Sequence, residues 1–231
     1  MDIQEIKNRL TKRATGLNIG TFKPTYSEKE SWIGRVAFYK EDESIPEDEA
    51  GYLMLPLLQI SLEGLPFVPE GLEQTKMLTL FISEDLPDGL TENGDGWLLR
   101  EYSKDDQLID KDLDNPDSYL RPFPLKTTFI KDDYPVWDSG AISTELEEEI
   151  LRLEKAGEIE DYYNVVENNY GHKLGGYPTF FQPGFSFEDG FEFMLQIASD
   201  EKARLNFVGG GALYLAKNKH TSQWRLYVDF P

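Results

Sequence analysis

Pro-Leu-Leu-Gln-Ile at residues 56–60 returns later in the chain as Phe-Met-Leu-Gln-Ile at residues 193–197. Each copy is followed by an apolar run typical of a strand, and then by a run that begins with tryptophan. These runs cover 77–81 and 97–102 after the first copy, and 212–215 and 224–228 after the second. Because their order and chemistry agree, we interpret the chain as a diverged duplication, and such a repeat takes priority over other fold signals.

Composition places the chain among globular proteins. Of its 231 residues, 39% are hydrophobic and 13% aromatic, which supplies a sizeable core. No run approaches the roughly eighteen apolar residues of a membrane-spanning helix, and the first residues contain no apolar stretch of signal-peptide length. The chain has no cysteine, which excludes disulfides and thiol catalysis and is typical of a reducing compartment. We therefore expect a cytoplasmic protein.

The formal net charge is -20, from 43 acidic and 23 basic residues. Such a charge repels phosphate backbones and anionic lipid, so we expect neither nucleic acid nor membrane as a partner. It would attract a cation or a basic protein, although a high charge of one sign also serves solubility alone. The densest acidic segment is 84–117, with twelve acidic and three basic residues.

Helical spacing occurs twice. It predicts a helix over 3–14 that ends near Gly16, and a second helix that ends at Gly157. Thr144 and Glu147 fit a capping box at the start of the second helix. The apolar positions are Ile3, Ile6, Leu10 and Ala14 in the first helix and Ile142, Leu146, Ile150 and Leu153 in the second.

Strand chemistry appears in 21–39, 77–82 and 97–102, whereas 53–62 is too short to assign by period alone. The fold class that we expect is α+β: β-rich, internally duplicated, with two related halves sharing one core. An N-terminal helix and a helix between the halves complete it. The whole chain, 1–231, would be a single domain made of two repeats, about 20–125 and 169–231, joined by a helical segment at 140–168.

The most distinctive stretch is Asn-Tyr-Gly-His-Lys-Leu-Gly-Gly-Tyr-Pro at 169–178. Gln182 follows it, and Met-Leu-Gln-Ile-Ala-Ser-Asp lies at 194–200. Together with 211–215 and 224–228, this set resembles the YwqG-like family of bacterial proteins of unknown function. The resemblance implies a mixed, β-rich fold of two related halves and brings no established activity or cofactor.

The chain departs from that family pattern in two places. In the first half, Ile-Gly-Arg-Val at 33–36 keeps one glycine and no proline of a Gly-Gly-x-Pro element. Before the penultimate strand, Phe-Val-Gly-Gly at 207–210 replaces a Trp-Gly-Asp segment. A ligand that depends on either element would not be expected here.

His172 is the most reactive candidate residue. A histidine titrates near neutral pH and can serve as general acid or base, or as a ligand contact at a cleft. Alternatively its ring bonds to backbone and fixes the adjacent Gly-Gly turn. We favour the structural role because no second catalytic group is visibly paired with it. His220 lies in a polar loop and is expected to be solvated.

Glycines and glutamines supply the other candidates. The Gly175-Gly176 turn before Tyr177 could present N–H groups to an anion, but no P-loop lysine follows, so a turn needing positive φ is the better interpretation. Gln59 and Gln196 occupy equivalent repeat positions, where each amide could bind a polar ligand or clamp a neighbouring loop. The predicted ligand-binding residues are therefore His172, Gly176, Tyr177, Gln182, Gln196 and Gln59.

No metal site or cofactor is predicted. Asp110, Asp112 and Asp114 have the one-three-five spacing of a calcium loop, but Asn115 and Arg121 stand where that loop needs Gly and Glu. We favour a non-enzymatic binding module that holds an unknown small polar ligand or a protein in the groove between its halves. The alternatives are an acidic immunity-type protein that neutralises a basic protein, and an enzyme that uses His172 as general acid/base.

Overall fold

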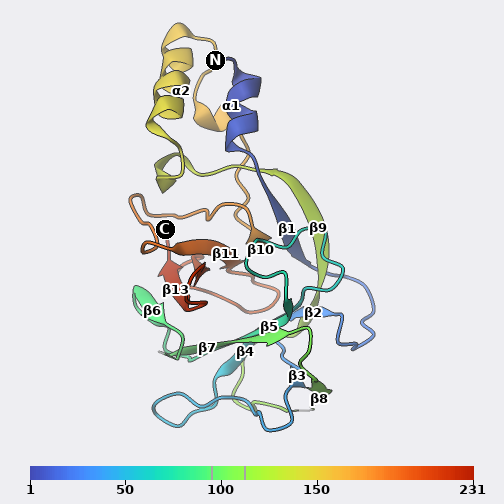
Figure 1. The fold of residues 1–231 in the computed structure, drawn as a ribbon. Helices are drawn as coiled ribbons and strands as arrows, with labels where there is room; N and C mark the ends of the chain where they lie inside the picture. Colours follow the sequence, from blue (N-terminus) through green and yellow to red (C-terminus); the bar gives the residue numbers. More distant parts are fainter. Residues whose placement is uncertain (95, 112) are drawn as a thin grey trace.

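The computed structural model describes residues 1–94, 96–111 and 113–231, and it consists of one strongly curved antiparallel sheet with a helical cap (Figure 1). The helices are α1 (Ile3–Leu10) and α2 (Thr144–Ala156), and short 3-10 helices cover Trp137–Ser139 and Tyr162–Asn164. The strands are β1 (Lys12–Ile19), β2 (Ser31–Ile33), β3 (Phe38–Tyr39), β4 (Leu55–Ser61), β5 (Thr75–Ile82), β6 (Leu90–Glu92), β7 (Trp97–Ser103), β8 (Ile109–Asp110), β9 (Phe123–Asp133), β10 (Lys173–Gly175), β11 (Phe191–Ala198), β12 (Ala212–Asn218) and β13 (Trp224–Asp229).

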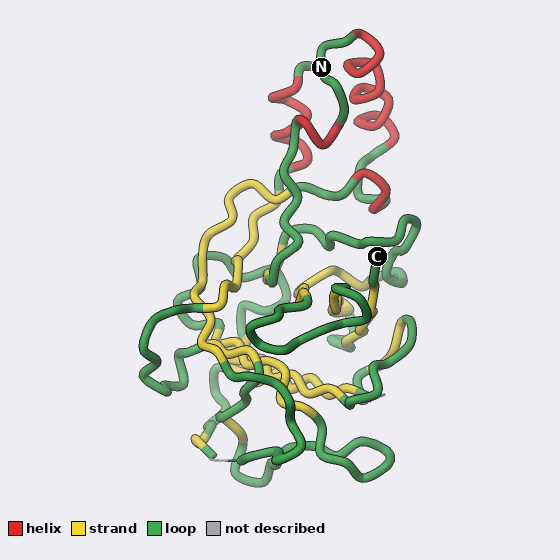
Figure 2. The backbone as a smooth tube through the Cα atoms, turned by 180° about the vertical axis from the view of Figure 1, so that it is seen from behind, coloured by secondary structure: helices red, strands yellow, loops and turns green. Residues whose placement is uncertain are grey.

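Strands β1 and β9 form the middle of the sheet. The strand order is β6-β13-β12-β11-β10-β1-β9-β2-β4-β5-β7, and β3 pairs with β8 in a separate small sheet. The β10–β13 strands form one arm and β2, β4, β5 and β7 form the other. Figure 1 shows the two arms facing each other as two layers, connected through the long strands β1 and β9. Seen from behind, the strands remain together while the helices project from one end (Figure 2).

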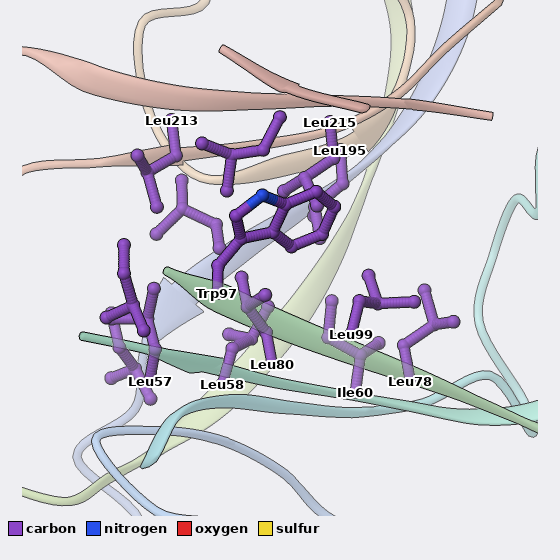
Figure 3. Close-up of a cluster of buried hydrophobic side chains, with 14 of the residues drawn as sticks. Leu57, Leu58, Ile60, Leu78, Leu80, Trp97, Leu99, Leu195, Leu213 and Leu215 are labelled. Carbon is purple, nitrogen blue, oxygen red and sulfur yellow. The ribbon is translucent and has the colours of Figure 1, made fainter. Parts of the chain in front are cut away.

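The space between the arms is filled by one apolar core. Trp97 is fully buried, with Leu58 and Leu80 from its own arm and Leu213 and Leu215 from the other arm in the same cluster (Figure 3). Each such buried leucine contributes about 1.5–3 kcal/mol relative to an exposed one. Neither arm can bury its apolar face without the other, so the two arms stabilise each other.

Two sets of side-chain hydrogen bonds involve β7, the last strand at one edge of the sheet. On β7, the N–H and carbonyl of Leu99 bond to the side-chain amide of Asn93 at 2.8 and 2.9 Å, so a side chain replaces a neighbouring strand. Also on β7, Glu101 accepts hydrogen bonds from Lys217 Nζ at 2.8 Å and Trp224 Nε1 at 3.1 Å. The edge of one arm is therefore protected, as exposed strand edges usually are, and tied to the other arm.

The helical cap has its own small core, formed by α1, α2 and the chain just after β9. Its buried members include Ile6 and Leu10 of α1, and Leu146, Ile150 and Leu153 of α2. Gly157 ends α2 in the left-handed conformation, with φ of 71°. These contacts confirm the apolar face predicted for α2 and attach the N-terminal helix to it.

The structure confirms a β-rich α+β fold with strands over 77–82 and 97–102, and it corrects three predictions. Of the segment 21–39, only Ser31–Ile33 and Phe38–Tyr39 are strands. The first helix ends at Leu10 instead of Ala14, because Ala14 and Gly16 lie in β1, between β9 and β10. The N-cap of α2 is Ser143, whose side chain accepts the Leu146 N–H, and not the Thr144 of the predicted capping box. Within the described residues, no helix is long and apolar enough to cross a membrane.

The corrected cap can be tested by paired substitutions at two exposed, neighbouring hydroxyl residues. Ser143→Ala should lower the free energy of unfolding by about 1 kcal/mol, because it removes the side-chain acceptor at the first turn of α2. Thr144→Ala should change it by a few tenths at most. Chemical denaturation followed by circular dichroism measures both. A larger loss for Thr144→Ala would mean that Thr144 is the N-cap, as the capping box predicts.

Candidate functional site

The Gly-Gly turn after β10 encloses a carboxylate of the protein itself. Gly175 and Gly176 have φ of 80° and 75°, as the sequence predicts for this turn. The next amide, Tyr177 N–H, donates to Asp133 Oδ2 at 2.7 Å. A Cβ on Gly176 would overlap this carboxylate oxygen, so a glycine is required here by close approach as well as by φ. The anion held by this turn is therefore internal.

Lys173 neutralises that buried carboxylate. Its Nζ lies 3.0 and 2.9 Å from the two oxygens of Asp133, and both side chains are fully buried. Burial lowers the pKa of Lys173 below its ordinary value, whereas the charge of Asp133 acts to raise it. Lys173 belongs to the distinctive motif, but no local pattern identifies its partner 40 residues earlier.

His172 is committed to backbone. Its Nδ1 accepts the Ala198 N–H at 3.0 Å, so the proton of a neutral ring would lie on Nε2, 3.8 Å from Asp200 Oδ2. The neighbouring His172 holds the pKa of Asp200 below its usual range, and the N–H groups of Lys202 and Ala203, which donate to this carboxylate, act in the same direction. The ring is 8% exposed. Because the basic lone pair already has a donor, this geometry leaves His172 no free base for a substrate.

Gln196 and Gln59 are fully buried and hold loops. Gln196 Oε1 accepts the Thr179 N–H at 3.0 Å, and its Nε2 donates to the Gly171 carbonyl at 3.1 Å. Gln59 Oε1 accepts the Ala37 N–H at 2.9 Å, and its Nε2 donates to the Glu30 carbonyl at 3.1 Å. In this structure both amides act as clamps on neighbouring loops, and neither is free for a ligand.

The six predicted site residues do not line a common groove. Tyr177 is buried, with Lys12 Nζ 4.2 Å above its ring, and burial raises the pKa of its hydroxyl. Gln59 lies in β4 of the opposite arm. Gln182 lines a cavity between described residues, although its Nε2 also donates to the Phe230 carbonyl at 3.0 Å.

That cavity, which we call the aromatic pocket, has a volume of about 190 Å³. It lies between the segment before α2, the segment after α2 and the loop that follows β10. Tyr163 and Tyr170 are half exposed, and the Tyr170 and Phe181 rings are 6.1 Å apart. The pocket is lined by Val136, Asp138, Tyr163, Tyr170, Phe180, Phe181, Gln182 and Pro183.

The polar groups of the aromatic pocket are Asp138 and the hydroxyls of Tyr163 and Tyr170. The Tyr163 hydroxyl accepts the Trp137 N–H at 3.2 Å, which fixes that ring. Burial and the neighbouring Tyr163 raise the pKa of Tyr170, so this phenol stays neutral at physiological pH. Among the described residues, neither the Asp138 carboxylate nor the Tyr170 hydroxyl has a hydrogen-bond partner. The pocket thus offers ring faces and one free carboxylate.

Sequence reasoning did not assign Asp138, Tyr163 or Tyr170 to a site. Tyr170 stands two residues before His172, inside the distinctive motif, and this proximity was the available signal. Asp138 and Tyr163 come from segments far from the motif in sequence, so only the fold places them beside it. Across the described ranges, no group of three or more potential metal ligands occurs. Asp110 lies in β8, and Asp112 lies outside the described residues.

Comparison with known families matches residues 31–221 to a domain of unknown function, DUF1963. The chain belongs to this family. The match covers the Gly-Gly turn, the Lys173–Asp133 pair and the aromatic pocket, and it begins at β2. No curated protein matches this DUF1963 chain at a significant level.

The buried ion pair of the DUF1963 fold gives a direct stability test. Lys173→Met should lower the free energy of unfolding by about 3–5 kcal/mol, because it leaves the Asp133 carboxylate buried without its cation. Lys29→Met is the matched control, since Lys29 forms an exposed pair with Glu63 and its loss should cost far less. Urea denaturation of both variants measures the difference. Similar costs would show that Lys173 is not the main partner of Asp133.

Proposed function

We propose that this protein is a non-enzymatic binding module that holds a cationic side chain of a basic protein partner in the aromatic pocket. The observation that carries the proposal is the pocket itself, which combines the half-exposed rings of Tyr163 and Tyr170 with Phe181 and a free carboxylate at Asp138. Ring faces attract a cation through their quadrupole, and a nearby carboxylate adds charge complementarity.

The surrounding charge supports a basic partner. Residues 138–167 carry ten acidic and two basic side chains, and the whole chain carries a net charge of -20. Such a field accelerates encounter with a basic surface. A volume of about 190 Å³ suits one lysine or arginine side chain rather than a large ligand. A protein that neutralises a basic partner, as immunity proteins do, is one form of this function.

An enzyme built on His172 is the weaker candidate. A general base must reach the proton that it abstracts. The Nδ1 of His172 is occupied by the Ala198 N–H, and the ring is almost fully buried. The nearest carboxylate, Asp200, faces the other ring nitrogen at 3.8 Å. These contacts favour a structural role for His172.

We also propose that the scaffold arose by duplication of one four-stranded arm. In support, β2–β4–β5–β7 and β10–β11–β12–β13 flank the β1–β9 pair in the same order. The register shifts at equivalent points, between Pro56 and Leu58 in one arm and between Phe193 and Leu195 in the other. We keep the repeat bounds of about 20–125 and 169–231, with the helical segment 140–168 between them, as part of this single-domain proposal.

The hydrogen bonds at the first strand of each arm support the same relationship. Ser31 Oγ accepts the Ser61 N–H at 3.1 Å, and His172 Nδ1 accepts the Ala198 N–H at 3.0 Å. Each donor stands two residues after the glutamine of its arm. His172 would then be the counterpart of a serine that satisfies one backbone amide. We also propose that the protein is YwqG-like, of bacterial origin and cytoplasmic.

A cationic peptide tests the binding function. The probe is a synthetic peptide of alternating lysine and glycine, titrated by calorimetry at low and at physiological salt. Tyr170→Leu and Asp138→Asn should each weaken binding roughly threefold to tenfold, because they remove a ring face and the free carboxylate. Neither side chain has a hydrogen-bond partner among the described residues, so the fold should persist.

Tyr52→Leu serves as the matched control, because Tyr52 is 71% exposed and lies outside the pocket. It should leave the affinity unchanged, and a peptide of alternating glutamate and glycine should not bind. Equal losses in Tyr52→Leu and Tyr170→Leu would mean that the acidic surface as a whole binds the peptide, and that the aromatic pocket has no special role.

A further inference from the structure

The first arm contains a turn that matches the Gly-Gly turn of the second arm. It follows β2 at residues 34–36, where Gly34 has a φ of 72°. A Cβ on Gly34 would come within 2.6 Å of the Arg121 carbonyl oxygen. A Cβ on Gly175 would come within 3.3 Å of the Arg13 carbonyl oxygen. Arg13 lies in β1, and Arg121 lies just before β9, so each glycine packs against the backbone of a central strand or of the chain that leads into it.

The two turns differ in what lies beside them. In the second arm, the Asp133 carboxylate accepts the Tyr177 N–H and pairs with Lys173. In the first arm, the turn lines a cavity of about 350 Å³, which we call the first-arm cavity. Among the described residues, the backbone N–H groups of Arg35 and Val36 have no hydrogen-bond partner. Within the described residues, the first-arm turn therefore has free backbone donors, and no carboxylate accepts from them as Asp133 does in the second arm.

Arg35 is one of the residues that line the first-arm cavity. The Arg35 guanidinium carbon lies 5.1 and 5.3 Å from the ring centres of Tyr26 and Trp32, which stack on each other. In the described part of the chain, no carboxylate lies within ion-pair distance of Arg35, although acidic residues outnumber basic ones by 43 to 23. A guanidinium held against rings and left unpaired is well placed to bind a planar carboxylate.

Other lining residues fit an organic ligand. The Ser118 hydroxyl oxygen is buried without a hydrogen-bond partner in the described structure. Val36, Leu113 and Leu120 provide apolar surface for a carbon skeleton. Asp114 also lines the cavity, so a second negative charge on the ligand would be repelled and an amino group would be attracted.

We propose that the first-arm cavity binds a small organic carboxylate, with an amino acid as the best-fitting class. Arg35 pairs with the carboxylate, which takes the place that Asp133 occupies in the second arm, and the free amides of the turn donate to it. The Ser118 hydroxyl and Asp114 contact the rest of the ligand. The comparison of turns rests on the proposed duplication, whereas the cavity and its unpaired donors do not.

The test follows the backbone amide of Val36 by heteronuclear NMR while single L-amino acids and their carboxamides are added to the full chain. At least one amino acid should shift the Val36 resonance in a saturable way, and its carboxamide, which lacks the carboxylate, should bind at least tenfold more weakly. Saturable shifts with inorganic phosphate of equal affinity would overturn the assignment to organic carboxylates. The absence of any saturable shift would overturn the site.

Substitutions locate the binding. Arg35→Met should weaken it at least tenfold, and Arg35→Lys, which keeps the charge but loses the planar pair of donors, should weaken it less. Lys126→Met is the control, since Lys126 is an exposed cation on β9 outside the cavity. Unchanged affinity in a folded Arg35→Met or Arg35→Lys variant would overturn the proposal. Tyr170→Leu should not change amino-acid binding in the first-arm cavity. A negative result for this cavity can therefore be distinguished from a negative result for cationic-peptide binding in the aromatic pocket.

Discussion

Two buried glutamine side chains hold the loops on which both proposed sites are built. A buried amide must satisfy its donors and acceptor. Gln59 bonds to backbone on both sides of β2, at Glu30 and Ala37. Gln196 bonds to the Gly171 carbonyl before β10 and to the N–H and hydroxyl of Thr179 after it. Gln196 thereby fixes the loop that carries Tyr170, and Gln59 fixes the turn that carries Arg35. The strands supply the rigid support and the loops supply the chemistry, which is the usual division of labour in proteins. Loss of either amide would leave several buried backbone groups unsatisfied at once.

The distinctive motif is explained by structural needs before any ligand is considered. His172 satisfies one amide at the end of β11, Lys173 neutralises a carboxylate, and Gly176 leaves room for that carboxylate. Asp133 in turn accepts the amide of Tyr177, so the end of β9 is joined to the turn after β10. A motif of this kind resembles a catalytic signature in sequence because it concentrates titratable residues beside glycines. The side chains of His172 and Lys173 contact groups of the protein itself, and Tyr170 is the motif residue that lines the aromatic pocket.

The architecture was readable from sequence where local patterns decide it, and less so where partners are distant. The four apolar positions of α2 predicted its buried face, but Ser143 and Thr144 are both good caps and only the backbone distinguishes them. Ala14 continued the helical period by coincidence, whereas pairing with β9 and β10 makes its segment a strand. The candidate site was harder still. Lysine is usually exposed, so nothing local marks Lys173 as buried or selects Asp133 among 43 acidic residues.

The central position of β1 has a consequence for the order of folding. The sheet neighbours of β1 are β9 and β10, which are synthesised more than 100 residues later: Thr15 pairs with Phe129 and with Leu174. During synthesis, β1, a central strand of the sheet, is therefore made long before the two strands that pair with it. Bringing together strands so distant in sequence costs loop-closure entropy before any stabilising contact forms, which slows their pairing. Until then, the apolar face of the first arm would stay exposed. Charge repulsion between acidic surfaces would keep this incomplete intermediate from associating.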